Sequence, residues 1–219
     1  MTERRPRKDA TRNRAAAFAA ADALFAQCQS PESITMADVA AAAGVGKATL
    51  FRAFGDRTGL IRALYEARLE PIRTAVEQGP PPLGPATPPH ARVAALLDAI
   101  LCFKLDNRHL ALALEQTGAD SPYRTEHYEQ WHTLLRDLLE QIPPLAGAGS
   151  ATFTAHALLA ATRADLVAYL AGEKDVSSDE LRQQLAAFTA SVLGTRTQGG
   201  RSPGTDDGRP SPSAPGFCC

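Results

Sequence analysis

The sequence predicts an all-α protein. Alanine and leucine recur at three- and four-residue spacing through most of the 219 residues, and alanine-rich segments without β-branched runs favour helices. No segment alternates apolar and polar residues as a half-buried strand does. Hydrophobic residues make up 44% of the chain, which is enough to fill the core of one large domain or two small ones.

Changes in composition predict the domain organisation. Six prolines between Gly79 and His90 fix φ and remove backbone donors, so they predict an extended linker. The last residues are rich in Gly, Pro and Ser and have little to bury, which predicts disorder. The expected segments are a disordered basic arm (1–9), a three-helix unit (10–56), a connecting helix (57–78), a proline-rich linker (79–90), a second helical domain (91–194) and a disordered tail (195–219).

The charge is unevenly distributed. The formal net charge is −1 at pH 7, but residues 1–14 hold six Lys and Arg and only two Asp and Glu. A basic N-terminal arm on a near-neutral protein fits local contact with phosphate groups. The competing interpretation is a solvated terminus without a partner.

The apolar segments are short. None approaches the ~18 residues of a membrane span, and no apolar signal segment follows the basic start. We therefore expect a cytoplasmic protein without a membrane partner. Cys28 and Cys102 fall in helical patterns and are expected to be reduced core residues, whereas Cys218 and Cys219 end the tail.

The first helical unit has clear helix boundaries. A first helix is expected over 12–28. Thr35 and Asp38 have the spacing of a capping box that opens a second helix, and Gly44 is expected to end it in the left-handed conformation. A third helix is expected over Lys47–Phe54, and Asp56 is expected to cap a fourth. The order is helix, turn, helix.

The third helix has an unusual outer face. Leu50 and Phe54 are expected to point inward. Small residues and one long arginine can enter a major groove without steric obstruction. The outward residues are Lys47, Ala48, Thr49, Phe51 and Arg52.

The stretch "ITMADVAAAAGVGKATLFRAFGDRTGLIRALY" resembles the DNA-binding segment of the TetR family of bacterial transcription regulators. The resemblance covers about residues 10–70. It implies an all-helical homodimer, a ligand cavity in a C-terminal helical domain for ligand binding and dimerisation, and repression relieved by a small molecule.

The resemblance also implies residue roles. Thr35 matches a phosphate-contacting helix cap, the turn from Lys47 to Thr49 matches the part of the recognition helix that enters the groove, and Arg57 matches a phosphate-contacting cation. Two residues depart from the family pattern. Phe51 stands where tyrosine is usual and Ala53 where histidine is common. Both departures remove possible polar contacts with phosphate. Lys47, Arg52 and the N-terminal arm are therefore expected to contribute more of the contacts with DNA.

The second helical domain is expected to contain five helices, near 91–105, 107–117, 121–142, 152–171 and 178–193. Ser121 before Pro122 is expected to cap the third of these helices, and Ser177 with Glu180 to form a capping box. Aromatic and polar residues among aliphatic ones predict a ligand pocket; each could instead simply pack or be solvated. The candidate ligand-binding residues are Phe103, Asn107, Tyr123, His127, Trp131 and Arg163.

The last two expected helices carry apolar residues on more faces than a monomer surface needs. Two such pairs can form a four-helix, two-fold symmetric interface. The candidate interface residues are Leu158, Leu166, Leu170, Leu181, Leu185, Phe188 and Val192.

Catalytic and metal-binding motifs are missing from the sequence. It contains no phosphate loop, nucleophile elbow or HExxH, and His127 and His132 are five apart and share a helix face poorly. We expect no enzyme activity, no cofactor and no metal site.

The expected function is that of a ligand-responsive transcriptional repressor. It would bind a palindromic double-stranded DNA operator as a homodimer and be released by an unidentified small-molecule effector. The alternatives are a protein-interaction scaffold with a vestigial helix-turn-helix and a helical enzyme. Pro71 is expected to kink or break the fourth helix near Glu70–Ile72, and a flexible linker would let that helix move.

Overall fold

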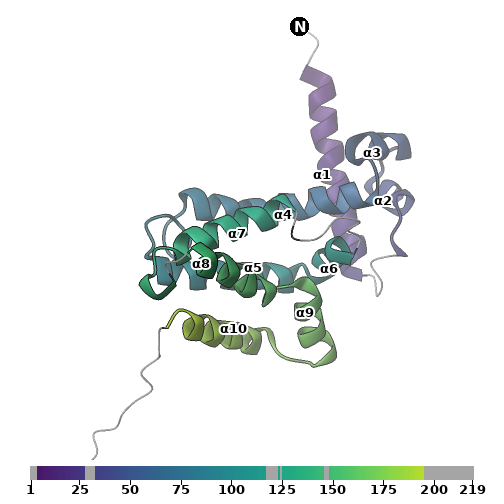
Figure 1. The fold of residues 1–219 in the computed structure, drawn as a ribbon. Helices are drawn as coiled ribbons and strands as arrows, with labels where there is room; N and C mark the ends of the chain where they lie inside the picture. Colours follow the sequence, from purple (N-terminus) through teal and green to yellow (C-terminus); the bar gives the residue numbers. More distant parts are fainter. Residues whose placement is uncertain (1–3, 28–32, 117–122, 124, 146–147, 195–219) are drawn as a thin grey trace, which may run out of the picture.

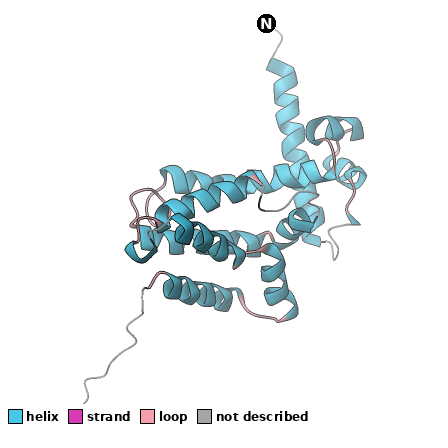
Figure 2. Ribbon diagram, in the orientation of Figure 1, coloured by secondary structure: helices cyan, strands magenta, loops and turns pink. Residues whose placement is uncertain are grey.

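The computed structural model describes residues 4–27, 33–116, 123, 125–145 and 148–194, and these residues contain helices and loops but no strand (Figure 2). The all-α fold class is confirmed. The elements are α1 (Arg4–Gln27), α2 (Met36–Ala43), α3 (Lys47–Phe54), α4 (Arg57–Gln78), α5 (Pro89–Asp106), α6 (Arg108–Gln116), α7 (Glu126–Leu139), a 3-10 turn (Pro143–Leu145), α8 (Ala148–Ala160), α9 (Ala164–Ala168), the π-helical turn η4 (Tyr169–Glu173) and α10 (Ser178–Val192). No described helix has the length and apolar character required to cross a membrane.

The N-terminal unit consists of α1, α2 and α3 beside the start of α4 (Figure 1). Helix α1 begins at Arg4, so residues 4–9 are helical and do not form the separate disordered arm expected from the sequence. Its far end projects away from the rest of the molecule in Figure 1. The tail expected over 195–219 lies outside the described residues, as does Cys28.

The helix-turn-helix forms as its local signals predict. The Thr35 side chain accepts from the Asp38 N–H at 3.2 Å, and Asp38 Oδ2 accepts from the Thr35 N–H at 2.9 Å, which completes the capping box. Gly44 has φ 64° and ends α2 in the left-handed region, where glycine alone avoids a steric penalty. Val39 and Leu50 are buried between the helices. The local sequence therefore fixes how α3 leaves α2.

Helix α4 runs unbroken through Pro71, so the expected break is not present. Asp56 caps it by accepting from the Gly59 N–H at 2.7 Å. Proline leaves the Ala67 carbonyl without its helical donor, but Pro71 and Ala67 are both exposed, so water can satisfy that carbonyl. The buried face of α4 holds it against the rest of the chain through Leu60, Ile61, Leu64, Tyr65, Leu69 and Val76.

The proline-rich segment is not the extended, flexible linker that its composition predicted. It forms consecutive turns, with the Gly84 N–H donating to the Pro80 carbonyl at 3.0 Å. Arg92 on α5 donates to the carbonyls of Leu83 at 2.8 Å and Val76 at 2.7 Å, and Thr87 is buried. These bonds tie the end of α4 to the start of α5.

Helix α5 lies at the centre of the C-terminal half, where α7, α9 and α10 pack against it, and α8 packs on α7 (Figure 1). The single helix expected over 152–171 is divided in two. The chain turns at Ala161–Arg163, where the Thr162 hydroxyl donates to the Leu159 carbonyl at 2.9 Å. Helix α7 begins at Glu126, and the expected cap at Ser121 and Pro122 lies outside the described residues. At α10, the Ser177 side chain accepts from the Glu180 N–H at 3.2 Å as expected.

The proposed interface residues divide by exposure. Leu158, Leu181 and Leu185 are buried within the chain and are not available to a partner in this structure. Leu166 and Phe188 are 39% and 42% exposed, and Leu170 and Val192 are partly buried. The sequence pattern identified the apolar helix faces correctly. It could not show which of them are buried within the chain, because that depends on the packing of α10 on α5 and not beside α8.

Candidate DNA-binding unit and ligand cavity

Helix α3 presents the side chains that the sequence assigned to its outer face. Lys47, Ala48, Thr49, Phe51 and Arg52 are all exposed, whereas Leu50 is 1% exposed and anchors the helix. The exposed face of this short helix therefore combines two small residues, Ala48 and Thr49, with two cations and one aromatic ring.

Phe54, at the end of α3, is fixed to α1. Its ring lies 5.7 Å from the ring of Phe18, and the Arg14 guanidinium lies within 5.3 Å of both ring centres. The orientation of α3 is therefore set by α1 as well as by the turn.

The polar groups of Thr35 are already engaged by Asp38. The Thr35 hydroxyl lies 2.7 Å from Asp38 Oδ2, and the same carboxylate accepts the Thr35 N–H. These hydrogen bonds lower the pKa of Asp38, so its carboxylate is charged at neutral pH. A DNA phosphate at this cap would have to share donors with Asp38.

Arg57, the first residue of α4, reaches back to the start of α2. Its Nε donates to the Ile34 carbonyl at 2.8 Å, and its guanidinium lies 5.9 Å from the centre of the Phe25 ring. The sequence marked Arg57 as a phosphate contact but not as a brace between helices, because its partner lies 23 positions away.

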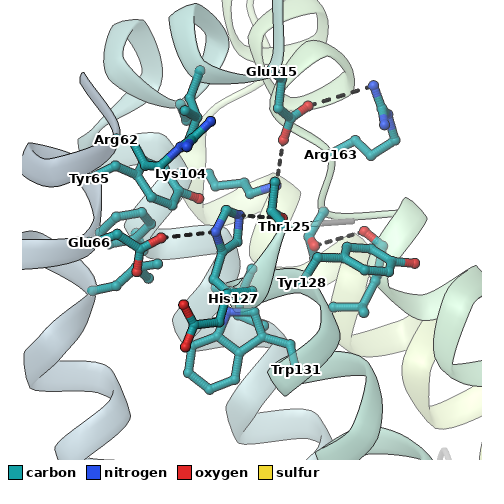
Figure 3. A pocket seen from close by; sticks show the side chains of 18 of the residues that line it. Arg62, Tyr65, Glu66, Lys104, Glu115, Thr125, His127, Tyr128, Trp131 and Arg163 are labelled. Carbon is teal, nitrogen blue, oxygen red and sulfur yellow. Dashed lines mark hydrogen bonds and ion pairs between the residues drawn. The ribbon is translucent and has the colours of Figure 1, made fainter. Parts of the chain in front are cut away.

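A cavity of about 730 Å³ lies beside α4 in the C-terminal half (Figure 3). Five of the six predicted ligand-binding residues line it, namely Phe103, Tyr123, His127, Trp131 and Arg163. They come from α5, α7, the segment before α7, and the turn before α9. The structure brings them together; whether they bind a ligand stays a prediction.

Asn107, the sixth predicted residue, does not line the cavity. Its Nδ2 donates to the Phe103 carbonyl at 2.7 Å at the end of α5, and its Oδ1 accepts from Arg68. Arg68 also pairs with Asp22 of α1 at 2.6 Å. Asn107 thus belongs to a bridge between α1, α4 and the α5–α6 corner.

Glu66 forms one ionic cluster in the cavity wall. It lies 3.1 Å from His127 Nδ1 and pairs with Arg73 (Figure 3). Burial alone would raise the pKa of Glu66, but the hydrogen bonds and charges of His127 and Arg73 outweigh burial and lower it. Helices α4 and α7 are joined here by a charged contact.

Glu115 forms a second cluster that sequence reasoning missed. It accepts from Lys104 Nζ at 2.9 Å and from the Ala164 N–H at 3.1 Å, and it lies 3.6 Å from Arg163. Glu115 of α6 therefore caps α9 from a distant part of the chain. No local pattern could have indicated this, because the partner N–H is 49 positions away.

Three donors in the cavity wall have no hydrogen-bond partner among the described residues: the buried Nε of Arg73, the Tyr65 hydroxyl and the Trp131 indole N–H. Tyr65 is 3% exposed and Trp131 is 6% exposed, and both line the cavity. Figure 3 shows the Tyr65 side chain directed from α4 into the space that the labelled residues surround. Burial, followed by the nearby charge of Glu115, raises the pKa of Tyr65, so its hydroxyl keeps its proton.

The histidines do not form a metal site among the described residues. His127 faces Glu66, whereas His132 lies 3.2 Å from the Thr152 carbonyl. His132 and His156 stack with ring centres 3.9 Å apart, and Tyr128 bonds His156 at 2.6 Å.

Residues 17–64 match the family model described as bacterial regulatory proteins, tetR family. The match covers α2, α3, the second half of α1 from residue 17 onward, and the start of α4. No curated protein matches the chain significantly.

Solved structures share the fold over most of the chain. A protein described as a TetR-family transcriptional regulator from Rhodococcus sp. is 21% identical, with a TM-score of 0.59, covering 83% of this chain and 98% of its own. Thermus thermophilus FadR, a TetR-family repressor in complex with lauroyl-CoA, is 18% identical, with a TM-score of 0.54 and coverages of 88% and 100%. At these identities the likeness shows the fold.

Proposed function

We propose that the chain, whose residues 17–64 match the family model of the tetR-family bacterial regulatory proteins, is a ligand-responsive transcriptional repressor. It binds a palindromic DNA operator as a homodimer and is released by a small-molecule effector. The observation that carries the proposal is that helix α4 belongs to both parts: it begins beside the recognition helix α3 and continues along the wall of the 730 Å³ cavity.

The DNA-binding part of the proposal rests on the exposed face of α3. Lys47, Ala48 and Thr49 enter the major groove first, and Arg52 is the side chain long enough to reach a base edge from the next turn. Arg12 and Arg14 on α1 are exposed and supply phosphate contacts beside it. Phe51 packs against the DNA backbone without donating a hydrogen bond.

The ligand-binding part rests on the cavity. Its volume of about 730 Å³ falls in the range of sites for small molecules, about 300–1,000 Å³. The Thermus thermophilus structure with the same fold holds lauroyl-CoA, which supports a small-molecule effector for this chain by analogy.

Coupling between the two parts runs through contacts on α4. Glu66 and Arg73 face the cavity, Arg68 joins α4 to α1 through Asp22, and Arg57 joins it to the start of α2. A ligand that favours one position of α4 therefore shifts α1 and α2 together. The proline-rich loop after α4 is held by the hydrogen bonds of Arg92, so this motion does not depend on a flexible linker.

The test is selection of bound sequences from random duplex DNA, followed by affinity measurement on the selected duplex. We expect a palindromic sequence, an affinity that falls with salt, and about 1–3 kcal/mol of lost binding at one base position for Arg52→Ala. Enrichment of no sequence by the wild-type protein would overturn the proposal.

A protein-interaction scaffold with a vestigial helix-turn-helix is a second candidate. It is favoured by Phe51, which is 40% exposed on α3 where a polar contact to DNA would be expected. The same selection separates the two, because a scaffold would show no salt-dependent binding to a duplex.

A further inference from the structure

The wall of the cavity contains hydrogen-bond donors that have no acceptor among the described residues. Tyr65 and Trp131, which are 3% and 6% exposed, each bring an O–H or N–H group that no described residue accepts, and Arg73 Nε is a buried donor of the same wall without a partner. A donor that faces a cavity without a protein partner is satisfied either by water or by a bound ligand. Tyr65 and Trp131 face the same cavity from opposite elements, α4 and α7.

The carboxylates in the wall are already engaged. Glu66 is held by His127 and Arg73, and Glu115 by Lys104, Arg163 and the Ala164 N–H. Arg73 and Arg163 also pair with Glu70 and Asp165, which do not line the cavity, so the wall itself holds the three cations Arg73, Lys104 and Arg163 beside these two paired carboxylates. The remaining charges, Arg62, Asp56 and Glu126, are on exposed residues.

We infer that the effector is an apolar molecule whose polar group is a hydrogen-bond acceptor, a carbonyl or a carboxylate, and not a cation. The acceptor takes the Tyr65 hydroxyl or the Trp131 indole N–H, while Phe103, Leu69 and Ile100 contact the apolar body. A cationic ligand would have to displace an existing partner from Glu66 or Glu115, because both carboxylates are already paired. This inference rests on the proposed function, since it names the effector class of the same cavity.

The test uses four matched probes with one apolar body: biphenyl, 4-acetylbiphenyl, biphenyl-4-carboxylate and biphenyl-4-ylmethylamine. Binding to the full-length protein is measured by calorimetry and by the fluorescence of Trp131, the chain's single tryptophan. We expect the ketone or the carboxylate to bind about tenfold or more tightly than the amine and than biphenyl. The stronger of the two identifies the acceptor. Equal or tighter binding of the amine overturns the inference.

Two variants locate the donor. Tyr65→Phe removes only the unpartnered hydroxyl, and Trp131→Phe removes the indole N–H and keeps an aromatic ring. At least one of them should lower the preference for the ketone or carboxylate over biphenyl to about a third or less. Tyr128→Phe is the matched control, because Tyr128 also lines the cavity but its hydroxyl is already bonded to His156 at 2.6 Å. If both donor variants keep the full preference, the inference is wrong.

Thermal unfolding distinguishes a ligand-binding hydroxyl from a structural one. Without ligand, Tyr65→Phe should keep or raise the melting temperature, since it removes a buried group that bonds nothing. A melting temperature lowered by several degrees would overturn the assignment of that hydroxyl to a ligand.

Duplex binding by the protein without probe is measured in parallel. Its absence would count against the proposed function while leaving the probe preference as a property of the cavity. Probe selectivity without DNA release would count against the assignment of these molecules as effectors.

Discussion

The side chain of Arg57 holds the backbone carbonyl of Ile34 through a 2.8 Å hydrogen bond from Nε. Ile34 immediately precedes the Thr35 cap, so the first residue of α4 is fixed to the point where α2 begins. Through this bond the proposed displacement of α4 would reach the helix-turn-helix.

Arg57→Ala should weaken binding to all duplexes alike, by about 1–3 kcal/mol. The substitution removes the brace to Ile34 and a positive charge near the DNA backbone, and neither reads a base. Fluorescence anisotropy on the selected duplex and on a scrambled one measures the effect. Arg62→Ala is the control, since Arg62 lies on the same helix but makes no contact with Ile34. Unchanged affinity on both duplexes would contradict the assignment.

The bridge from Asp22 through Arg68 to Asn107 should carry part of the ligand response. Arg68→Met keeps the apolar stem but removes the 2.6 Å pair with Asp22 and the bond to Asn107. Ligand-induced DNA release should shrink, with ligand affinity kept within about twofold, because a partly exposed pair contributes at most about 1 kcal/mol. Arg136→Met, which breaks a comparably exposed pair with Asp137 on α7, is the control. Full release in Arg68→Met would exclude the bridge.

Pro71→Ala should stabilise the protein by about 1–3 kcal/mol, because α4 is already helical at this position and alanine restores a donor to the Ala67 carbonyl. Chemical denaturation measures the change. Pro85→Ala in the proline-rich loop is the control and should give no such gain. The same variant tests the coupling role of Pro71: if ligand-induced release is unchanged, Pro71 has no part in it.

The wild-type protein should be a dimer at micromolar concentration. Leu166 and Phe188 are exposed apolar side chains, and Phe188 lines a shallow groove of about 160 Å³ with Leu170. A charge on this surface would be buried without a partner, so Phe188→Glu should give a monomer by sedimentation equilibrium. Gln183→Glu adds the same charge elsewhere on exposed α10 surface and should remain dimeric. A monomeric wild-type protein would refute the dimer.

His156 should titrate below its ordinary pKa of about 6.5. Partial burial and then the charge of the stacked His132 lower its pKa. The unfolded chain binds more protons in this window, so this site makes the protein less stable as pH falls below about 6.5. NMR titration should show the pKa of His156 rising in His132→Asn and unchanged in His90→Asn. An equal pKa in both variants would contradict the repulsion.

Local signals in the sequence predicted the helix-turn-helix well. The Thr35–Asp38 capping box and the left-handed Gly44 need only residues within a few positions of each other, and Leu50 is buried as its spacing indicates. The physical reason is that caps and helix faces are set by near neighbours.

Long-range contacts were not predictable in this way. The turn before α9 contains no glycine or proline, and its position is set by Glu115, which binds the Ala164 N–H from α6. The proline-rich segment has the composition of a linker, but Arg92 binds the carbonyl of Leu83 within it and that of Val76 before it. Asn107 was predicted from the sequence to line the ligand pocket, but it lies at the end of α5 and binds Arg68. Each outcome depends on a partner that the local sequence does not reveal.

The Asp22–Arg68 pair has a consequence for how the protein senses its environment. Its two side chains are 33% and 35% exposed, so dissolved ions reach the pair and screen it. Salt also weakens phosphate contacts by competing for them. Ionic strength would then act on two parts of the proposed mechanism. It would weaken the contacts with DNA phosphates, and it would weaken the Asp22–Arg68 pair that is proposed to couple α4 to α1. At a different ionic strength, the same effector concentration would then produce a different response by the proposed repressor.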